Sequence, residues 1–157
     1  MKNEYLNIYN NLIKLTRDKK LYLNAGSTET FSLRLIFFLI HFALFLRNYK
    51  KDNSKKILQE IYDYNFRQLE ISIREIGYGD VSINKKMKDY LNLFHKIISD
   101  VDTWDKMETK KKSIFFENII GKDANQTFFI DYFDKYETFL KKNTLNSFTK
   151  DILEIDN

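Results

Sequence analysis

The feature that most constrains this chain is its shortage of residues that turn a backbone sharply. Its 157 residues include no proline and only four glycines. Sheet-rich folds need many tight turns, and tight turns draw heavily on these two residues. The chain is therefore predicted to be all-α, a single-domain bundle of about six helices with no sheet.

Length and composition are those of one folded domain. Hydrophobic residues make up 43% of the chain and charged residues 31%, which is typical of a globular protein. No internal repeat or long linker divides the sequence. We expect one helical domain over residues 1–157, with a C-terminal tail at 143–157. The first residues include Glu4 and lack an apolar core, so we expect no signal or transit peptide.

Apolar side chains recur three and four residues apart along most of the chain, which is the spacing of one helix face. The predicted helices cover about residues 3–20, the apolar stretch 35–46, and about residues 54–76, 82–100, 103–120 and 125–142. Hydroxyl side chains are expected to cap several of them, namely Ser27 or Thr28, Ser54, Ser82 and Thr103. The tail carries one weaker helical pattern, formed by Phe148, Ile152 and Leu153.

The apolar stretch 35–46 raises the question of a membrane span. A helix needs about 20 apolar residues to cross the hydrocarbon core. Only twelve residues separate Arg34 from Arg47, and one of them is His41. We therefore expect a central helix buried on nearly all sides and no transmembrane helix, while shallow contact with a membrane surface stays open.

Residues that usually carry catalysis or bind metals are scarce. The chain has no cysteine and two histidines, which excludes disulfides, thiolate metal sites and cysteine nucleophiles. Neither histidine has a glutamate three residues before it, as di-iron bundles require, and no Gly-x-Ser-x-Gly motif occurs. His41 is expected to be a core histidine bonded to a neighbouring carbonyl. We expect no enzyme activity, no metal and no cofactor.

The most informative stretch is residues 73–82, which read Ile-Arg-Glu-Ile-Gly-Tyr-Gly-Asp-Val-Ser. Gly77 stands where a helix would end in a left-handed residue, a conformation that glycine adopts without steric cost. Gly79 would allow a second bend before the next helix. The stretch is thus predicted to be a corner between two helices.

Charged residues gather at this corner. Beside the glycines stand Arg74, Glu75 and Asp80, and the expected first turn of the next helix carries Lys85, Lys86 and Lys88. Lysines near a helix N-terminus oppose the helix dipole, so they indicate either an acidic partner or simply a lysine-rich composition. The net charge is only +4, and its excess lies wholly in residues 1–80. Such a mild excess gives no reason to expect DNA binding.

This order of features resembles the ubiquinol–cytochrome c chaperone family over about residues 5–142. In that family a helix ends in Leu-Arg-Glu-Met-Gly-Val-Gly-Asp, where this chain has Ile73-Arg74-Glu75-Ile76-Gly77-Tyr78-Gly79-Asp80. The family's basic helix start, Val-x-Lys-Arg/Lys-Met-Lys, is matched by Ile83-Asn84-Lys85-Lys86-Met87-Lys88. Its aromatic helix with an internal histidine is matched around His41.

The resemblance implies a non-catalytic helical assembly chaperone that binds newly made cytochrome b and assists formation of the ubiquinol–cytochrome c reductase complex. It implies a cytoplasmic protein at the inner face of the respiratory membrane, in peripheral contact with it. A second assembly factor and the ribosome stay open as further partners. We expect the partner-binding residues to be Arg74, Glu75, Gly77, Tyr78, Gly79, Asp80, Lys85, Lys86 and Lys88.

Two functions of other classes stay open on the sequence. One is a module that binds RNA or the ribosome surface, for which binding would fall steeply with salt. The other is a helical enzyme with a carboxylate site, which would need a pocket that encloses Glu70 or Glu75 together with His95.

Overall fold

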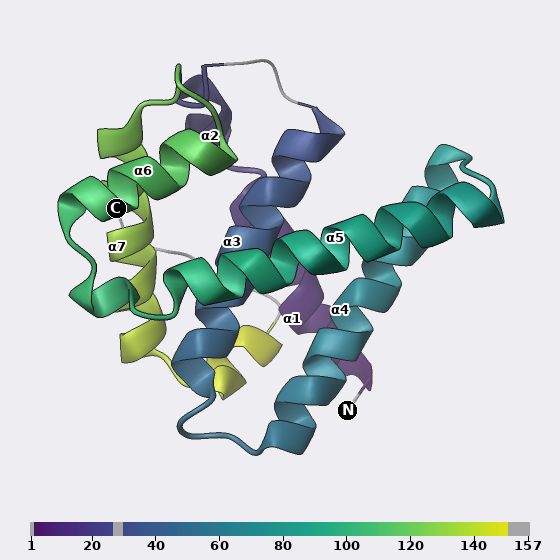
Figure 1. The fold of residues 1–157 in the computed structure, drawn as a ribbon. Coiled ribbons are helices and arrows are strands. Elements are labelled where there is room, and N and C mark those ends of the chain that lie inside the picture. The colour runs from purple at the N-terminus through teal and green to yellow at the C-terminus, as the bar shows by residue number, and fades with distance from the viewer. Residues whose placement is uncertain (1, 27–29, 151–157) are drawn as a thin grey trace.

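The computed structural model describes residues 2–26 and 30–150 (Figure 1). Its α-helices, in chain order, are α1 (Lys2–Thr16), α2 (Lys19–Leu23), α3 (Phe31–Tyr49), α4 (Lys55–Ile76), α5 (Asp80–Val101), α6 (Thr109–Ile119) and α7 (Gln126–Lys142). Two short 3-10 helices are η1 (Trp104–Lys106) and η2 (Leu145–Thr149). No strand occurs in the described residues, and six of the α-helices have 11 residues or more. The predicted all-α bundle of about six helices is confirmed.

Helix α3 is the centre of the fold. It packs against α1, α5 and α7, and the apolar side chains of its middle turns are almost fully buried. By length and composition alone, α3 is the one helix among the described residues that could cross a membrane. However, 61% of its most apolar 18-residue stretch is buried inside the protein. The expected central core helix is therefore confirmed.

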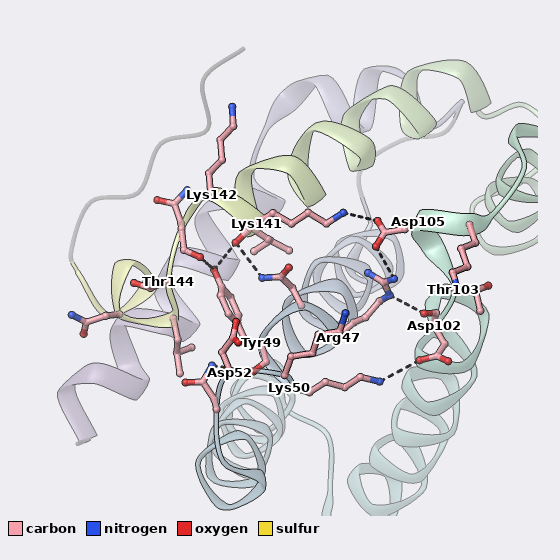
Figure 2. Close-up of a pocket in the computed structure, with 18 residues that line it drawn as sticks. Arg47, Tyr49, Lys50, Asp52, Asp102, Thr103, Asp105, Lys141, Lys142 and Thr144 are labelled. Carbon is pink, nitrogen blue, oxygen red and sulfur yellow. Dashed lines mark hydrogen bonds and ion pairs between the residues drawn. The ribbon is translucent and has the colours of Figure 1, made fainter.

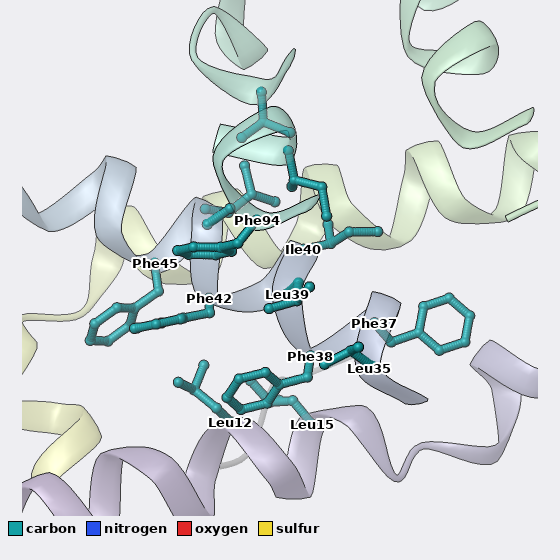
Figure 3. Packing of buried hydrophobic residues seen from close by; sticks show 14 of the residues in the cluster. Leu12, Leu15, Leu35, Phe37, Phe38, Leu39, Ile40, Phe42, Phe45 and Phe94 are labelled. Carbon is teal, nitrogen blue, oxygen red and sulfur yellow. The ribbon is translucent and has the colours of Figure 1, made fainter. Parts of the chain in front are cut away.

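Aromatic rings from separate helices pack over this centre (Figure 3). Phe42 of α3 stacks on Phe94 of α5 with ring centroids 5.2 Å apart. In Figure 3, Leu12 and Leu15 of α1 lie next to Phe38. Aromatic pairs of this kind contribute about 0.5–1.5 kcal/mol beyond the burial of their area. The packing fixes α5 against α3, and this in turn positions the far end of α5.

His41 lies inside this core with no exposed surface. Its Nδ1 is 2.6 Å from the carbonyl oxygen of Phe37, and its Nε2 is 2.7 Å from the hydroxyl of Tyr132. Burial lowers the pKa of His41 to about 4, so the ring is neutral at pH 7. Nδ1–H then donates to the carbonyl and Nε2 accepts from the tyrosine. The predicted core histidine bonded to a neighbouring carbonyl is confirmed.

The first predicted helix is divided in two. Helix α1 ends at Thr16 instead of about residue 20. Asp18 then caps α2 by accepting a hydrogen bond from the Lys20 amide at 3.0 Å. A side-chain cap of this kind competes with helix continuation, and apolar spacing alone did not reveal it.

One expected helix cap is confirmed in this part of the fold: Ser54 caps α4, as predicted. Helix α3 is capped by Thr30, whose hydroxyl oxygen is 3.1 Å from the Leu33 amide nitrogen. The expected caps Ser27 and Thr28 lie outside the described residues.

The predicted helix over residues 103–120 is also divided. The short helix η1 comes first, and α6 begins only at Thr109, because Met107 and Glu108 are extended. Thr103 precedes η1 but makes no capping hydrogen bond with its side chain. The buried indole of Trp104 donates to a carboxylate oxygen of Asp134 at 3.0 Å, and this long-range contact holds η1 against α7.

The tail packs onto α1. Phe148 of η2 is fully buried, and the amide of Asn11 donates to the carbonyls of Phe148 and Lys150, each at 2.8 Å. Part of the weak helical pattern expected in the tail is therefore a 3-10 helix. Ile152 and Leu153 lie outside the described residues.

Candidate functional site

The far ends of α4 and α5 form a hairpin that projects from the body of the molecule (Figure 1). Helix α4 ends at Ile76, and Gly77 follows in the left-handed region with φ of 106°. The Gly77 amide donates to the carbonyl of Arg74 at 3.0 Å, which satisfies one of the last carbonyls of the helix. The predicted helix stop at Gly77 is confirmed.

Gly79 and Ser82 act differently from their predicted roles. The φ of Gly79 is −77°, which any residue adopts, and this glycine is the N-cap of α5. Helix α5 begins at Asp80, and the Gly79 carbonyl accepts from the Ile83 amide at 2.9 Å. The prediction that Ser82 caps the helix is wrong, because Ser82 already lies inside the first turn. The carboxylate of Asp80 favours this earlier start, since it complements the helix dipole.

One ion pair spans the turn. Nη1 of Arg74 lies 2.6 Å from Oδ1 of Asp80, and this hydrogen bond raises the pKa of Arg74. The pair joins the last turn of α4 to the first turn of α5. Both side chains remain open to water, with 45% and 82% of their surfaces exposed. Exposed ion pairs add little to folding stability. Because both side chains are exposed, their charged groups are accessible to a partner.

The three lysines lie farther along α5 than predicted. Because α5 begins at Asp80, Lys85, Lys86 and Lys88 occupy its second and third turns, away from the N-terminal end of its dipole. Nζ of Lys86 lies 4.5 Å from the ring centroid of Tyr78, which is a cation–π contact. Lys85 and Lys88 are exposed.

Large apolar side chains are exposed at the same place. Ile76 is 55% exposed, Tyr78 44% and Val81 85%. No other six-residue stretch of the described chain exposes as many large apolar side chains. The hairpin extends beyond the body, so the core cannot cover them. We call this set the corner surface; it comprises Arg74, Glu75, Ile76, Gly77, Tyr78, Gly79, Asp80, Val81, Lys85, Lys86 and Lys88.

Two members of the corner surface, Ile76 and Val81, were not among the site residues expected from the sequence. The sequence does show apolar residues on both sides of the helix end at Gly77, and this was the one signal that could have identified them. A side chain at such an end reaches the core only if another element covers the turn. The pattern alone did not show that this turn is uncovered.

A polar cavity of about 890 Å³ lies where the C-terminal ends of α3, α5 and α7 meet (Figure 2). The guanidinium of Arg47 lies 3.1 Å from Asp105 and 3.2 Å from Glu137. Its Nε donates to the carbonyl of Asp102 at 2.8 Å, and Lys141 also reaches Asp105 at 2.8 Å. Helix C-termini carry partial negative charge that cations neutralise. We therefore interpret this network as structural.

The carboxylate site that an enzyme would need is not formed by the expected residues. Glu75 is exposed at the corner, whereas Nε2 of His95 lies 3.3 Å from the hydroxyl of Tyr62. Neither they nor Glu70 line the polar cavity or the two smaller cavities beside α4. Among residues 2–26 and 30–150, no group of three His, Asp or Glu side chains could hold a metal ion.

The corner surface lies within the part of the chain that matches a known protein family. A family model described as Ubiquinol-cytochrome C chaperone matches residues 24–113, more than half of the chain. No curated protein and no solved structure gives a match. The matched segment runs from the loop before α3 into α6 and so contains the whole corner surface. The wider resemblance over residues 5–142 stays a prediction. The chain therefore belongs to the ubiquinol–cytochrome C chaperone family, whose name indicates a chaperone rather than an enzyme.

Proposed function

We propose that this protein is a non-catalytic assembly chaperone that binds newly made cytochrome b and assists formation of the ubiquinol–cytochrome c reductase complex. The corner surface is the proposed docking site for this client. Family membership supports the chaperone role, and the exposed groups of the corner surface support this choice of docking site.

The observation that carries the proposal is the exposure of Ile76, Tyr78 and Val81 at the end of a projecting hairpin. Moving a side chain of this size from water into an apolar contact contributes about 1.5–3 kcal/mol. Cytochrome b is a hydrophobic membrane protein, and its apolar segments offer such contacts before insertion. The three side chains are the proposed anchors of the interface.

The charged groups form the proposed rim around these anchors. Charges at an interface rim speed encounter and fix orientation more than they add affinity. Lys85 and Lys88 make the α5 side of the corner cationic. We therefore expect acidic residues of the client to lie against that side, and we expect Arg74 and Asp80 to contact polar groups of the client at the end of the hairpin.

The proposed place of action is the cytoplasmic, inner face of the respiratory membrane, in peripheral contact with the lipid. A second assembly factor and the ribosome are proposed as further partners. The proposed location follows from the proposed client, which is a membrane protein, and the two further partners stay open as they do on the sequence.

Capture of cytochrome b during cell-free synthesis tests the proposal. The tagged protein is present while radiolabelled cytochrome b of the same organism is translated, and the co-purified label is measured. Replacing two of the three anchors, Tyr78→Ser with Val81→Ser, should reduce capture about tenfold, because interface energy is concentrated in a few buried side chains. Arg74→Ala with Asp80→Ala should weaken capture while circular dichroism and Tm stay unchanged.

The matched control is Leu23→Ser. Leu23 is 82% exposed and lies on α2, far from the corner in Figure 1, so its replacement should leave capture intact. If the corner variants capture as much cytochrome b as the native protein does, the client docks elsewhere. Loss of helicity in those variants would show that the corner is structural. If the native protein captures no cytochrome b, the proposed function is wrong.

A further inference from the structure

Two adjacent cavities lie at the end of the molecule where α4 begins. The polar cavity of about 890 Å³ shares Arg47, Lys50 and Asp102 with a smaller cavity of about 290 Å³ between α3, α4 and α5. The three shared residues form the boundary between the two cavities. Helix α4 is 22 residues long, so its first residue lies about 33 Å along the helix from the corner surface at its other end (Figure 1).

The smaller cavity has a mainly apolar lining. Its open apolar surface comes from half-buried side chains on three helices, which are Leu46, Leu58 and Ile98. Its two uncharged polar side chains are already engaged. Nε2 of Gln59 donates to Asp63 at 2.9 Å, and the hydroxyl of Tyr62 lies 3.3 Å from Nε2 of His95. Such a cavity suits hydrocarbon, because it removes apolar surface from water and offers few free hydrogen-bonding groups.

Positive side chains outnumber carboxylates around the two cavities. Seven lysine and arginine residues line them, against three aspartates. Glu137, which pairs with Arg47 and is buried, brings the carboxylates to four. The local excess is thus three positive charges, whereas the whole chain carries a net charge of +4. Most of the net charge of the protein is therefore gathered at this end of the molecule.

Four of these lysines are not used by the fold. Lys50 and Lys141 pair with Asp102 and Asp105, and Figure 2 shows both pairs. Within residues 2–26 and 30–150, the ammonium groups of the other four lysines form no ion pair or hydrogen bond, and all four side chains are exposed. They are available to an anionic partner. We call them the cationic rim, which comprises Lys51, Lys55, Lys106 and Lys142.

We propose that this end of the molecule binds an anionic phospholipid of a membrane surface. The cationic rim holds the phosphate, and the smaller cavity takes part of an acyl chain. Each lysine near an anionic lipid surface strengthens binding about fivefold. The apolar cavity beside the cations favours a lipid over a nucleic acid or a free phosphate, because neither of these has a hydrocarbon chain to bury.

This inference rests on the proposed function, since it names the surface through which the chaperone contacts the membrane. Lys55 is the first residue of α4, and Ile76 of the corner surface is the last. The lipid and the client therefore have separate sites at the two ends of one helix, and both can be bound at the same time.

Vesicle flotation of the full-length protein tests the proposal. The vesicles contain phosphatidylcholine alone, or phosphatidylcholine and phosphatidylglycerol in equal parts. The native protein should bind only the anionic vesicles, and added salt should weaken this binding. Lys51→Gln with Lys55→Gln should weaken it about 25-fold, because two rim charges are lost.

The matched control is Lys19→Gln with Lys20→Gln. This pair removes the same charge from exposed positions on α2 that line neither cavity, so it should bind anionic vesicles as the native protein does. Equal weakening by the two pairs of substitutions would overturn the proposal, because net charge alone would then explain the binding.

A soluble lipid tests the apolar cavity. Short-chain dihexanoyl phosphatidylglycerol should bind about tenfold more tightly than glycerol phosphate, because burial of two methylene groups is worth that factor. Leu58→Trp should fill the cavity and remove this preference, with circular dichroism as the check that the variant is folded. Equal affinity of the native protein for the two ligands would overturn the proposal in favour of a free phosphate. Tighter binding of a single-stranded RNA than of anionic vesicles would overturn it in favour of a nucleic acid.

Cytochrome b capture separates this inference from the proposed function. If the native protein captures cytochrome b but binds no anionic vesicles, the proposed function stands and the lipid site is wrong. If it binds anionic vesicles through the cationic rim but captures no cytochrome b, the lipid site stands and the proposed function is wrong. Tyr78→Ser with Val81→Ser should leave vesicle binding intact, and its loss in this folded variant would contradict separate sites.

Discussion

Acidification should destabilise this protein through His41. The pKa of this histidine falls from 6.5 to about 4 on folding, because burial disfavours the charged ring. As the pH falls, the unfolded chain therefore binds the proton first. The stability that depends on the neutral ring is complete above about pH 6.5 and is lost as the pH falls toward about 4. The full pKa shift corresponds to about 3 kcal/mol in the free energy of unfolding. About 2 kcal/mol of this stability is lost by pH 5.

Other groups titrate in the same range, so a matched variant is needed. Burial raises the pKa of Glu137, which makes the folded state relatively more stable as the pH falls. The hydrogen bond from Lys141 lowers the pKa of Asp105, which acts in the opposite direction. His41→Gln leaves both unchanged and does not itself titrate. Its side chain can donate to the Phe37 carbonyl and accept from the tyrosine hydroxyl.

The assay is urea unfolding at several pH values, followed by the fluorescence of the single tryptophan, the buried Trp104. Between pH 7 and pH 5 the native protein should lose about 2 kcal/mol more than His41→Gln. NMR titration of the ring gives a second readout, in which His41 should stay neutral down to about pH 5. Equal pH dependence in the two proteins would refute the reasoning.

Two further predictions concern folding stability, measured by urea unfolding. Gly77→Ala should lower the free energy of unfolding by about 1–2 kcal/mol, because a φ of 106° is strained for any residue with a side chain. Gly79→Ala should be neutral, because its φ is −77° and the space around its Cβ position is open. Equal losses at the two glycines would contradict the assigned turn. Arg47→Ala should cost about 3–5 kcal/mol, because it leaves the Glu137 carboxylate buried without its cation. Lys50→Ala, which removes an exposed pair with Asp102, should cost less than about 1 kcal/mol; a similar loss in both variants would argue against a buried network.

Features set by local chemistry could be predicted from the sequence. Gly77 ends α4 as expected, because a left-handed stop depends on one residue and its immediate neighbours. The apolar run around His41 forms the central helix, because so many consecutive apolar residues can be covered only in the middle of the fold. The proximity of Arg74 and Asp80 could be expected from the sequence, since a single turn separates them.

Features set by contacts between distant elements could not be predicted in this way. Helical spacing continued past Thr16, yet the Asp18 cap divides the helix there. Trp104 could not be assigned to a separate short helix until its partner Asp134, thirty residues away, was known. The exposure of Val81 depends on the absence of a covering element within the described fold, and no spacing pattern encodes that.

The proposed contact between Val81 and newly made cytochrome b can be tested directly by photo-crosslinking. A photoreactive amino acid is placed at Val81 or, as control, at Leu23, positions that are 85% and 82% exposed. Each protein is illuminated during cell-free synthesis of radiolabelled cytochrome b. A client that docks on the corner surface gives a labelled adduct from position 81 and little or none from position 23. Equal adducts from both positions, or none from position 81, would contradict the corner as the docking site.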